Sequence, residues 1–434
     1  MKQIIYKTPK QTKAEVGRIE LIQSVLKDFE DRKQKRMPLE LQWRLNQEFL
    51  NGNQNTYVTT METLASLGKQ FHWQQREVFN HIAPLIESRL ARLFETEKGE
   101  VRSEKDRGQI ASAFDDQDEK ETVGAEFFRP RENQNDQWSH QNFSLLTSHF
   151  SLPRTATTWS ETTGTAFYKI VWKNNPEIII VSPFEIYPDN LEAADLTQVR
   201  SLIHAKELTV EEIDEIWGID LRDKDKKTAM VIERYEIPTK LRPNGRLIII
   251  AGDKLAHDGE LPFINGEDGS RTFPFVRQTC EDVVGGFFGR SVIERAIPVQ
   301  RAYNAVKNRK AEFMARLACG VLAVEDGSVD MESLESEGLA PGKVITYRQG
   351  MSAPTFLDPG TIPAELGSEE EKLLSEFEII AGGDITRHNV QGAHAMELLM
   401  QKSAQSLART RHNLQSAIKQ VEEHVERLEA QFGN

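Results

Sequence analysis

The sequence predicts an α+β protein, with helices and strands in separate stretches of the 434-residue chain. Three observations support this prediction. Residues 12–50 repeat apolar side chains at spacings of three and four, which is typical of an amphipathic helix. Residues 165–259 contain runs of β-branched and aromatic residues between turn signals, which is typical of strands. The helical spacing returns near residue 291 and predicts three further long helices.

The N-terminal region is expected to contain several helices. The first should be interrupted at Pro38, because proline lacks the N–H that a helix interior needs. A second, amphipathic helix is expected over residues 74–94, and it carries Pro84. The charged residues 95–137 are interpreted as an exposed loop with solvated helix faces, and residues 138–160 as a packed helix.

The middle of the chain is expected to be rich in strands. Residues 165–172 and 177–188 are predicted to form a hairpin. A short helix follows, with Thr209 and Glu212 as a capping box at its start and Gly218 at its end. Further strands are expected over residues 228–237 and 245–259.

The last third of the chain is expected to consist of long helices around an insert. A helix over residues 291–320 precedes a β-rich insert at 321–357, and a second helix follows at 364–383. A short polar loop then leads into the final helix. Its apolar residues alternate spacings of four and three, which favours packing on neighbouring helices. These residues are Leu414, Ile418, Val421, Val425, Leu428 and Phe432.

Composition limits the class of protein. The length predicts two or more lobes, and two cysteines are too few for a disulfide framework. No apolar run approaches a membrane span and the N-terminus lacks a signal-peptide core, so we expect a cytoplasmic origin without membrane partners. The net charge of −13 argues against tight clamping of DNA, but it permits local basic patches or a partner that slides.

Catalytic and metal-binding motifs are weak. The segment before the helix at 291 resembles a phosphate loop, but Val284 stands at the first glycine position and Arg290 at the lysine position. A hinge into the helix, at Gly289, is the better interpretation. His388, His394 and Asp384 share one loop without firm metal-ligand spacing, so an exposed loop is favoured. We therefore expect no enzymatic activity, no metal and no cofactor.

The order of these elements resembles the portal proteins of tailed bacteriophages, in particular the head-to-tail connectors of short-tailed phages. The resemblance covers roughly residues 40–430 and rests on the order of several strings. They are WRLNQEFLNGNQ from Trp43, NHIAPLIE from Asn80, GTAFYKIVW from Gly164, VSPFEIYPDN from Val181, GRSVIERAIPVQRAYN from Gly289 and EGLAPGKVI from Glu337.

The resemblance implies a portal fold. Its parts would be a wing of N-terminal helices and mixed α+β structure, a first stem helix, a β-rich clip, a second stem helix, a tunnel loop and a C-terminal wing or crown helix. Many relatives continue into a crown, whereas this sequence ends at Asn434, so a crown would be minimal or absent. The implied boundaries are 1–288, 289–320, 321–362, 363–383, 384–395 and 396–434.

The resemblance also implies a function: a ring, usually a dodecamer, that forms a DNA channel at one capsid vertex for packaging, retention and ejection. Implied partners are double-stranded DNA, the terminase large subunit, the major capsid and scaffolding proteins, and tail adaptors. The protein would belong to the virion and occupy the host cytoplasm during assembly. The alternatives are a ring- or filament-forming virion protein without a DNA channel and, as an enzyme, a nucleotide-dependent DNA motor.

The stem helices carry the candidate interface residues. We expect basic side chains of one subunit to lie beside acidic side chains of the next, with surplus carboxylates in the lumen repelling DNA phosphates. Solvated helix faces are the alternative interpretation. The basic residues are Arg301, Lys307, Arg309 and Lys310, and the acidic ones are Glu365, Glu369, Glu370, Glu371 and Glu376.

Two further candidate sites follow from the resemblance. The clip would dock the packaging motor and adaptors through Met331, Leu334 and Leu339. The tunnel loop would touch DNA, and its glycines would let it move as DNA passes. Its residues are Arg387, His388, Asn389, Val390, Gln391, Gly392, Ala393 and His394.

Overall fold

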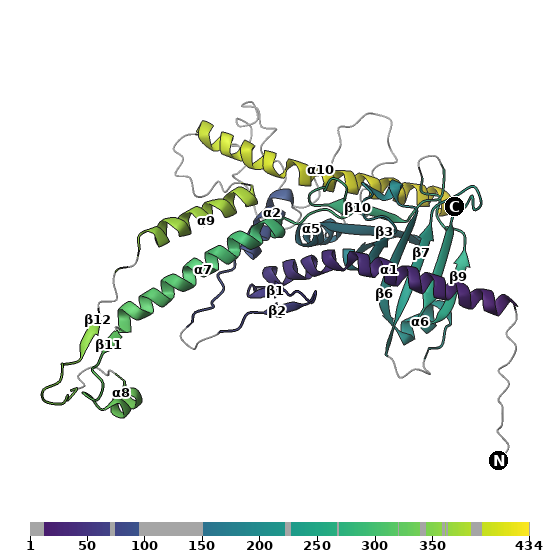
Figure 1. The fold of residues 1–434 in the computed structure, drawn as a ribbon. Helices are drawn as coiled ribbons and strands as arrows, with labels where there is room; N and C mark the ends of the chain where they lie inside the picture. Colours follow the sequence, from purple (N-terminus) through teal and green to yellow (C-terminus); the bar gives the residue numbers. More distant parts are fainter. Residues whose placement is uncertain are drawn as a thin grey trace, which may run out of the picture.

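A computed structural model describes residues 13–69, 74–94, 151–221, 227–266, 269–319, 321–338, 344–357, 361, 363–382 and 393–433. The chain forms an α+β lobe from which a long helical arm projects (Figure 1). The predicted α+β class is therefore confirmed.

Two antiparallel sheets form the lobe. The five-stranded sheet has the order β5-β6-β7-β8-β9, and the three-stranded sheet has the order β10-β3-β4. The predicted hairpin is β3 and β4, paired from Phe167–Val181 to Lys173–Asn175. The strands are β3 (Thr165–Lys173), β4 (Asn175–Val181), β5 (Ile186–Pro188), β6 (Ser201–Thr209), β7 (Thr228–Glu236), β8 (Arg246–Ala251), β9 (Lys254–Gly259) and β10 (Phe275–Thr279).

The short helix α6 (Val210–Trp217) forms as the sequence predicts. Thr209 and Glu212 make the full capping box, in which each side chain binds the other's backbone N–H. Gly218 ends the helix with φ 65°, a left-handed conformation that favours glycine. The helix covers one end of the five-stranded sheet, where Ile213 is buried beside Leu221.

Helix α1 (Lys13–Leu50) continues through Pro38 instead of breaking there. Its first half packs Val25 and Phe29 onto the five-stranded sheet. Just before the proline, Arg36 donates hydrogen bonds to the carbonyl oxygens of Pro183 (2.8 Å), Phe184 (2.8 Å) and Ile186 (2.5 Å). Contacts with the lobe on both sides of Pro38 offset the missing helix hydrogen bond, so the predicted interruption is wrong.

Helix α10 (Ala393–Phe432) covers the three-stranded sheet together with α5 (Ser151–Thr163). Four residues of the predicted apolar stripe are buried, Ile418 is half-buried and Phe432 is exposed, and the main contacts of the stripe are with a sheet. Val421, Val425 and Leu428 pack among Tyr168 and Val276. The expected packing on neighbouring helices occurs only in part, on α5 and α2, because an apolar helix stripe fits a flat sheet face equally well.

The arm consists of α7 (Val292–Cys319) and α9 (Glu365–Ala381), which run side by side in opposite directions (Figure 1). Its tip holds β11 (Val321–Ala323), α8 (Met331–Glu337) and β12 (Thr355–Leu357). The arm joins the lobe in one core formed with α1 and α2 (Ile82–Phe94). This core includes Phe49, Ile86, Ile293, Tyr303 and Phe377.

The tip corrects the prediction of a β-rich insert. β11 and β12 pair over only three residues, and the segment 344–349 is not a strand. The apolar Val344, Tyr347 and Phe356 are exposed instead. Alternating apolar residues form a stable strand only where a partner surface buries one face, and the described part of the tip offers no such surface.

The segment 74–81 is extended, although the sequence pattern assigned it to a helix. Helix α2 begins only at Ile82, because the Asn80 side chain caps it by accepting hydrogen bonds from the N–H groups of Ile82 (3.0 Å) and Ala83 (3.2 Å). Residues 95–150, which include the expected loop and most of the expected helix at 138–160, lie outside the described residues.

The extended segment is held on α7 by a ladder of side-chain acceptors, which we call the amide ladder. The backbone N–H groups of residues 75, 77, 79 and 81 donate to Glu312 (3.0 Å), Asn308 (3.0 Å), Asn304 (3.0 Å) and Gln300 (2.9 Å). Four helical residues rise about 6.0 Å and two extended residues rise about 6.6 Å. The two repeats therefore match over this length. Side-chain acceptors on α7 bind alternate N–H groups of the segment, as a neighbouring strand would in a sheet.

Replacing Asn304 and Asn308 with leucine should release this segment. The change removes two acceptors. The partly buried N–H of Phe79 loses its partner at a cost of about 1–3 kcal/mol, whereas the exposed N–H of Glu77 can bind water. We expect amide hydrogen exchange within residues 75–81, measured by mass spectrometry, to accelerate at least about tenfold. Ala315→Leu, at an exposed position of the same helix, should leave the exchange unchanged. Equal exchange in the double variant and the wild type would show that the ladder does not hold the segment.

Gly289, predicted as a hinge, lies in a tight joint between the arm and the lobe. Its N–H donates to Thr165 Oγ1 (2.8 Å), and a Cβ added to it would lie 2.5 Å from the carbonyl oxygen of Gly164. The glycine is needed because two backbone segments touch there, and the hinge stays a prediction.

Candidate functional site

The arm carries most of the residues that the sequence singles out. Lys307 Nζ donates to Glu370 Oε1 (3.1 Å), and Lys310 Nζ donates to Glu370 Oε2 (3.2 Å). Burial alone would raise the pKa of Glu370, but the hydrogen bonds and charges of the two lysines lower it. These pairs join α7 to α9 within one chain. The pairing between neighbouring subunits that the sequence suggested for these residues stays a prediction.

The two arm helices present opposite charges to solvent. On α7, Arg301, Arg309 and Arg316 are exposed. On α9, the predicted acidic residues other than Glu370 are exposed: Glu365, Glu369, Glu371 and Glu376. The internal ion pairs hold the helices together, so these outer charges remain available to another surface.

Arg301 also has a structural role that the sequence did not reveal. Its guanidinium donates to the carbonyl oxygen of Thr56 (3.0 Å) and lies over the ring of Phe49, 5.1 Å from the centroid. The residue thus attaches the hairpin of β1 (Thr56–Val58) and β2 (Leu64–Ser66) to the arm.

A groove of about 610 Å³ lies between the helices near the tip of the arm. Arg309 and Arg316 line it on α7, and Glu365 and Glu369 line it on α9. The predicted basic and acidic residues therefore meet here within one chain. Phe313 and Leu366 give the groove an apolar floor, which suits an amphipathic protein segment better than a small polar substrate.

The predicted tunnel loop lies mainly outside the described residues, because the structure describes none of residues 383–392. Ala393 and His394 belong to the backbone of α10. The base of the loop is described. Gly382 ends α9 with φ 97°, and Arg92 donates to the carbonyl oxygen of Ala381 (2.7 Å). Arg411 of α10 donates to the carbonyl oxygen of Arg92 (3.0 Å). The end of α9 that precedes the loop is thus attached to α2, and α10 is attached to α2 farther along, at Arg411.

The predicted clip residues lie at the tip of the arm. Met331 is exposed and Leu334 is half-buried on α8, whereas Leu339 lies outside the described residues. The sequence analysis missed Val344, Tyr347, Phe356 and Leu357, which are also exposed. The alternation of apolar residues marked this segment in the sequence and predicted a strand. The pattern alone does not show whether another element packs on the apolar face of that segment.

A polar network joins the two sheets and has the residue types of a catalytic site. Glu233 Oε2 accepts hydrogen bonds from Lys169 (2.5 Å) and Tyr235 (2.6 Å) and contacts His204 Nδ1 (3.1 Å). Burial would raise the pKa of Glu233, but the His204 hydrogen bond and the Lys169 charge hold it far below its ordinary value. No pocket described here is lined by these residues, so we interpret the network as structural.

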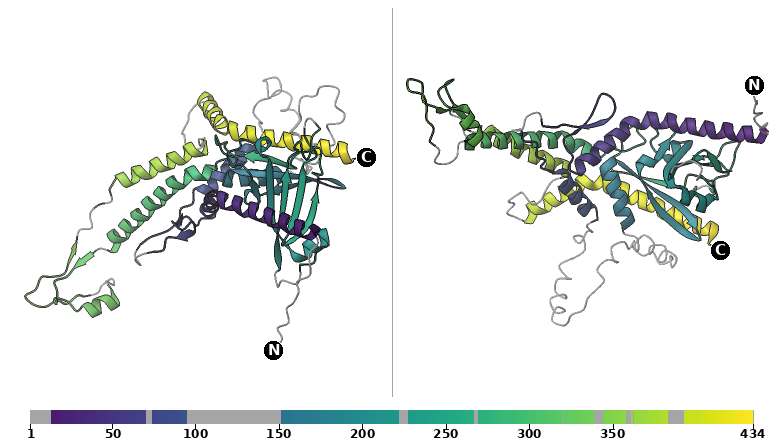
Figure 2. Two further views of the ribbon diagram at one scale, coloured as in Figure 1. Left: turned by 45° about the vertical axis from the view of Figure 1, so that its right-hand side comes forward. Right: turned by 90° about the horizontal axis from the view of Figure 1, so that it is seen from below.

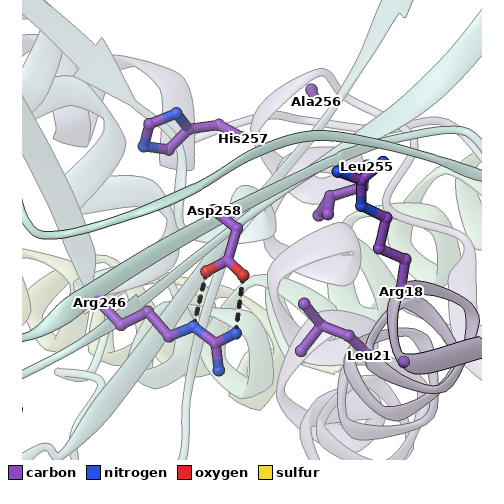
Figure 3. A pocket seen from close by; sticks show the side chains of 8 residues that line it. Arg18, Leu21, Arg246, Leu255, Ala256, His257 and Asp258 are labelled. Carbon is purple, nitrogen blue, oxygen red and sulfur yellow. Dashed lines mark hydrogen bonds and ion pairs between the residues drawn. The ribbon is translucent and has the colours of Figure 1, made fainter. Parts of the chain in front are cut away.

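A second pocket lies between the start of α1 and the β8–β9 hairpin (Figure 3). Arg246 donates two hydrogen bonds to the Asp258 carboxylate (2.7 and 2.9 Å), and this pairing lowers the pKa of Asp258. Leu21 and Leu255 supply its apolar side. His257 also lines the pocket, but the Asp258 carboxylate is already paired with Arg246 and no hydroxyl or thiol group is among the lining residues, so the pocket supports no catalytic assignment.

The described residues contain neither a candidate metal-binding cluster nor a candidate membrane-spanning helix. In the described ranges, no group of three or more His, Cys, Asp or Glu side chains is placed to hold a metal ion. None of the described helices is long and apolar enough to cross a bilayer.

Comparison with known proteins gave no match, either to a family model or to a curated protein.

Proposed function

We propose that this chain is the subunit of a portal ring that forms a channel for viral DNA. The observation that carries the proposal is the arm: a two-helix stem with internal ion pairs, exposed basic residues on α7 and exposed acidic residues on α9, some of which meet in the groove between the helices, and an apolar tip. These features support a head-to-tail assembly, in which the α7 side of one copy lies against the α9 side of the next. Such contacts close into a ring when the rotation between copies is suitable.

The charges of the arm fit a channel through which DNA slides. Each exposed ion pair contributes only about 0–1 kcal/mol, but the pairs recur around a ring. Carboxylates left over on α9 would repel phosphates within a Debye length of about 8 Å at physiological salt. The net charge of −13 agrees with a surface that DNA passes without sticking.

The tip and the loop at the base of α9 have separate proposed roles. The exposed apolar residues of the tip would bind the packaging motor, the terminase large subunit, and later the tail adaptors. The loop after Gly382, which follows the carbonyl group of Ala381 that Arg92 binds, would approach the DNA. The capsid and scaffolding proteins would surround the lobe. The protein would serve as a structural channel in the virion and leave ATP hydrolysis to the motor.

A second candidate is a ring or filament protein of the virion without a DNA channel. The same opposite charges favour it, because head-to-tail contacts form open filaments when the rotation does not close. The two candidates differ in the presence of an axial hole.

Negative-stain electron microscopy and mass photometry of the purified chain test the proposal. We expect closed rings with an axial hole as wide as a DNA duplex, about 20 Å across. Glu371→Lys with Glu376→Lys should convert rings to monomers, whereas Glu215→Lys, exposed on α6, should leave them intact. Filaments or compact oligomers without a hole would overturn the channel, and ATP hydrolysis by the purified chain would favour a motor.

A further inference from the structure

The β1–β2 hairpin exposes apolar side chains beside the arm. Tyr57, Val58 and Leu67 are exposed, and Met61 at its turn is 85% exposed. The two strands pair over only three residues, and such a ribbon gains little stability alone. An apolar group that remains outside the core in a rigid position indicates a contact with another surface.

The hairpin is rigidly attached to the arm from one side. Arg301 holds the carbonyl oxygen of Thr56, and Asn304 Nδ2 donates to Gln54 Oε1 (2.7 Å) just before β1. Gln54 in turn donates to Asn80 Oδ1 (2.9 Å), which connects the hairpin to the amide ladder. The apolar turn is therefore presented by a fixed base.

The opposite side of the arm exposes a second apolar residue at the same level. Tyr303 faces Phe377 across the α7–α9 contact, with ring centroids 6.4 Å apart. Two residues turn a helix by about 200°, so Arg301 faces away from α9 and Ile379 faces away from α7. Ile379 is 77% exposed. The hairpin and Ile379 thus lie on opposite sides of the arm, and the view from below shows the hairpin on the α7 side (Figure 2).

We propose that the hairpin packs on the outer face of α9 around Ile379 in a second copy of this chain. The occupant is a second copy because one chain carries both halves, on opposite sides and at one level along the arm. A rotation about an axis nearly parallel to the arm preserves that level and brings the halves together. The charges agree, because Arg301 lies beside the hairpin and Glu376 is exposed about one turn from Ile379. The inference rests on the proposed ring and names its interlocking contact.

Disulfide cross-linking tests this contact in the full chain. Met61→Cys and Ile379→Cys are combined in a Cys319→Ser background; Cys280 is buried. On mild oxidation, we expect a ladder of covalently linked chains on denaturing gels, which dithiothreitol reverses. A bond within one chain is excluded because the two positions lie on opposite sides of the arm. Met61→Cys with Ile216→Cys is the matched control, since Ile216 is an exposed apolar residue on α6.

Electron microscopy of the same samples separates this inference from the proposed function. Closed rings with linked chains support both. Closed rings that give no more linked chains than the Ile216 control overturn the hairpin contact and leave the ring standing. Linked chains without rings support the hairpin contact and overturn the proposed ring. If neither linked chains nor rings form, the hairpin contact and the ring are both overturned.

Discussion

Replacing Arg89 with methionine is expected to destabilise the protein by roughly 3–5 kcal/mol, because it leaves a buried carboxylate without a partner. Arg89 of α2 donates two hydrogen bonds to Glu161 of α5, at 2.8 and 3.1 Å, and both side chains are buried. Burial lowers the pKa of Arg89, but the charge of Glu161 outweighs this effect and leaves the pKa raised. Arg89 is therefore charged in the folded protein.

A double-mutant cycle separates the pair from the packing around it. Glu161→Leu in the Arg89→Met variant should recover most of the lost stability, since an apolar pair of similar volume removes the uncompensated charge. Urea denaturation followed by circular dichroism gives the free energy of unfolding of each variant. If the two single changes were additive, the residues would contribute independently and the ion pair would not connect α2 to α5.

Gly164→Ala is expected to be the most damaging small substitution in the lobe. Gly164 ends α5 with φ 92°, and a Cβ there would lie 2.1 Å from the carbonyl oxygen of Gly289. The clash is with backbone, so relief requires the arm to move away from β3. We expect a loss of several kcal/mol, or failure to accumulate as soluble protein.

The control for Gly164 is another glycine without this contact. A Cβ on Gly367, within α9, meets nothing within 4 Å, and Gly367→Ala should stabilise the helix by up to about 1 kcal/mol. Gly289→Ala tests the same joint from its other side and should resemble Gly164→Ala. A melting temperature unchanged by Gly164→Ala would show that the joint can open without cost.

Local patterns in the sequence predicted the elements whose stability is local. Thr209, Glu212 and Gly218 cap α6 with contacts that span only a few residues, and the β3–β4 hairpin closes over a short turn. The exposure of Glu365 and Glu369 also follows from their charge, because a charge without a buried partner remains in water.

The tertiary structure decided everything that depends on a distant partner. Whether Glu370 pairs within the chain, whether residues 75–81 are helical, and whether the α10 stripe meets a helix or a sheet all depend on neighbours remote in sequence. A periodic pattern specifies which face of a helix or strand is apolar, but not which element packs against that face. The sequence by itself therefore determined most of the elements and their charges. The packing determined the remaining elements, the arm, its joint and its exposed apolar hairpin.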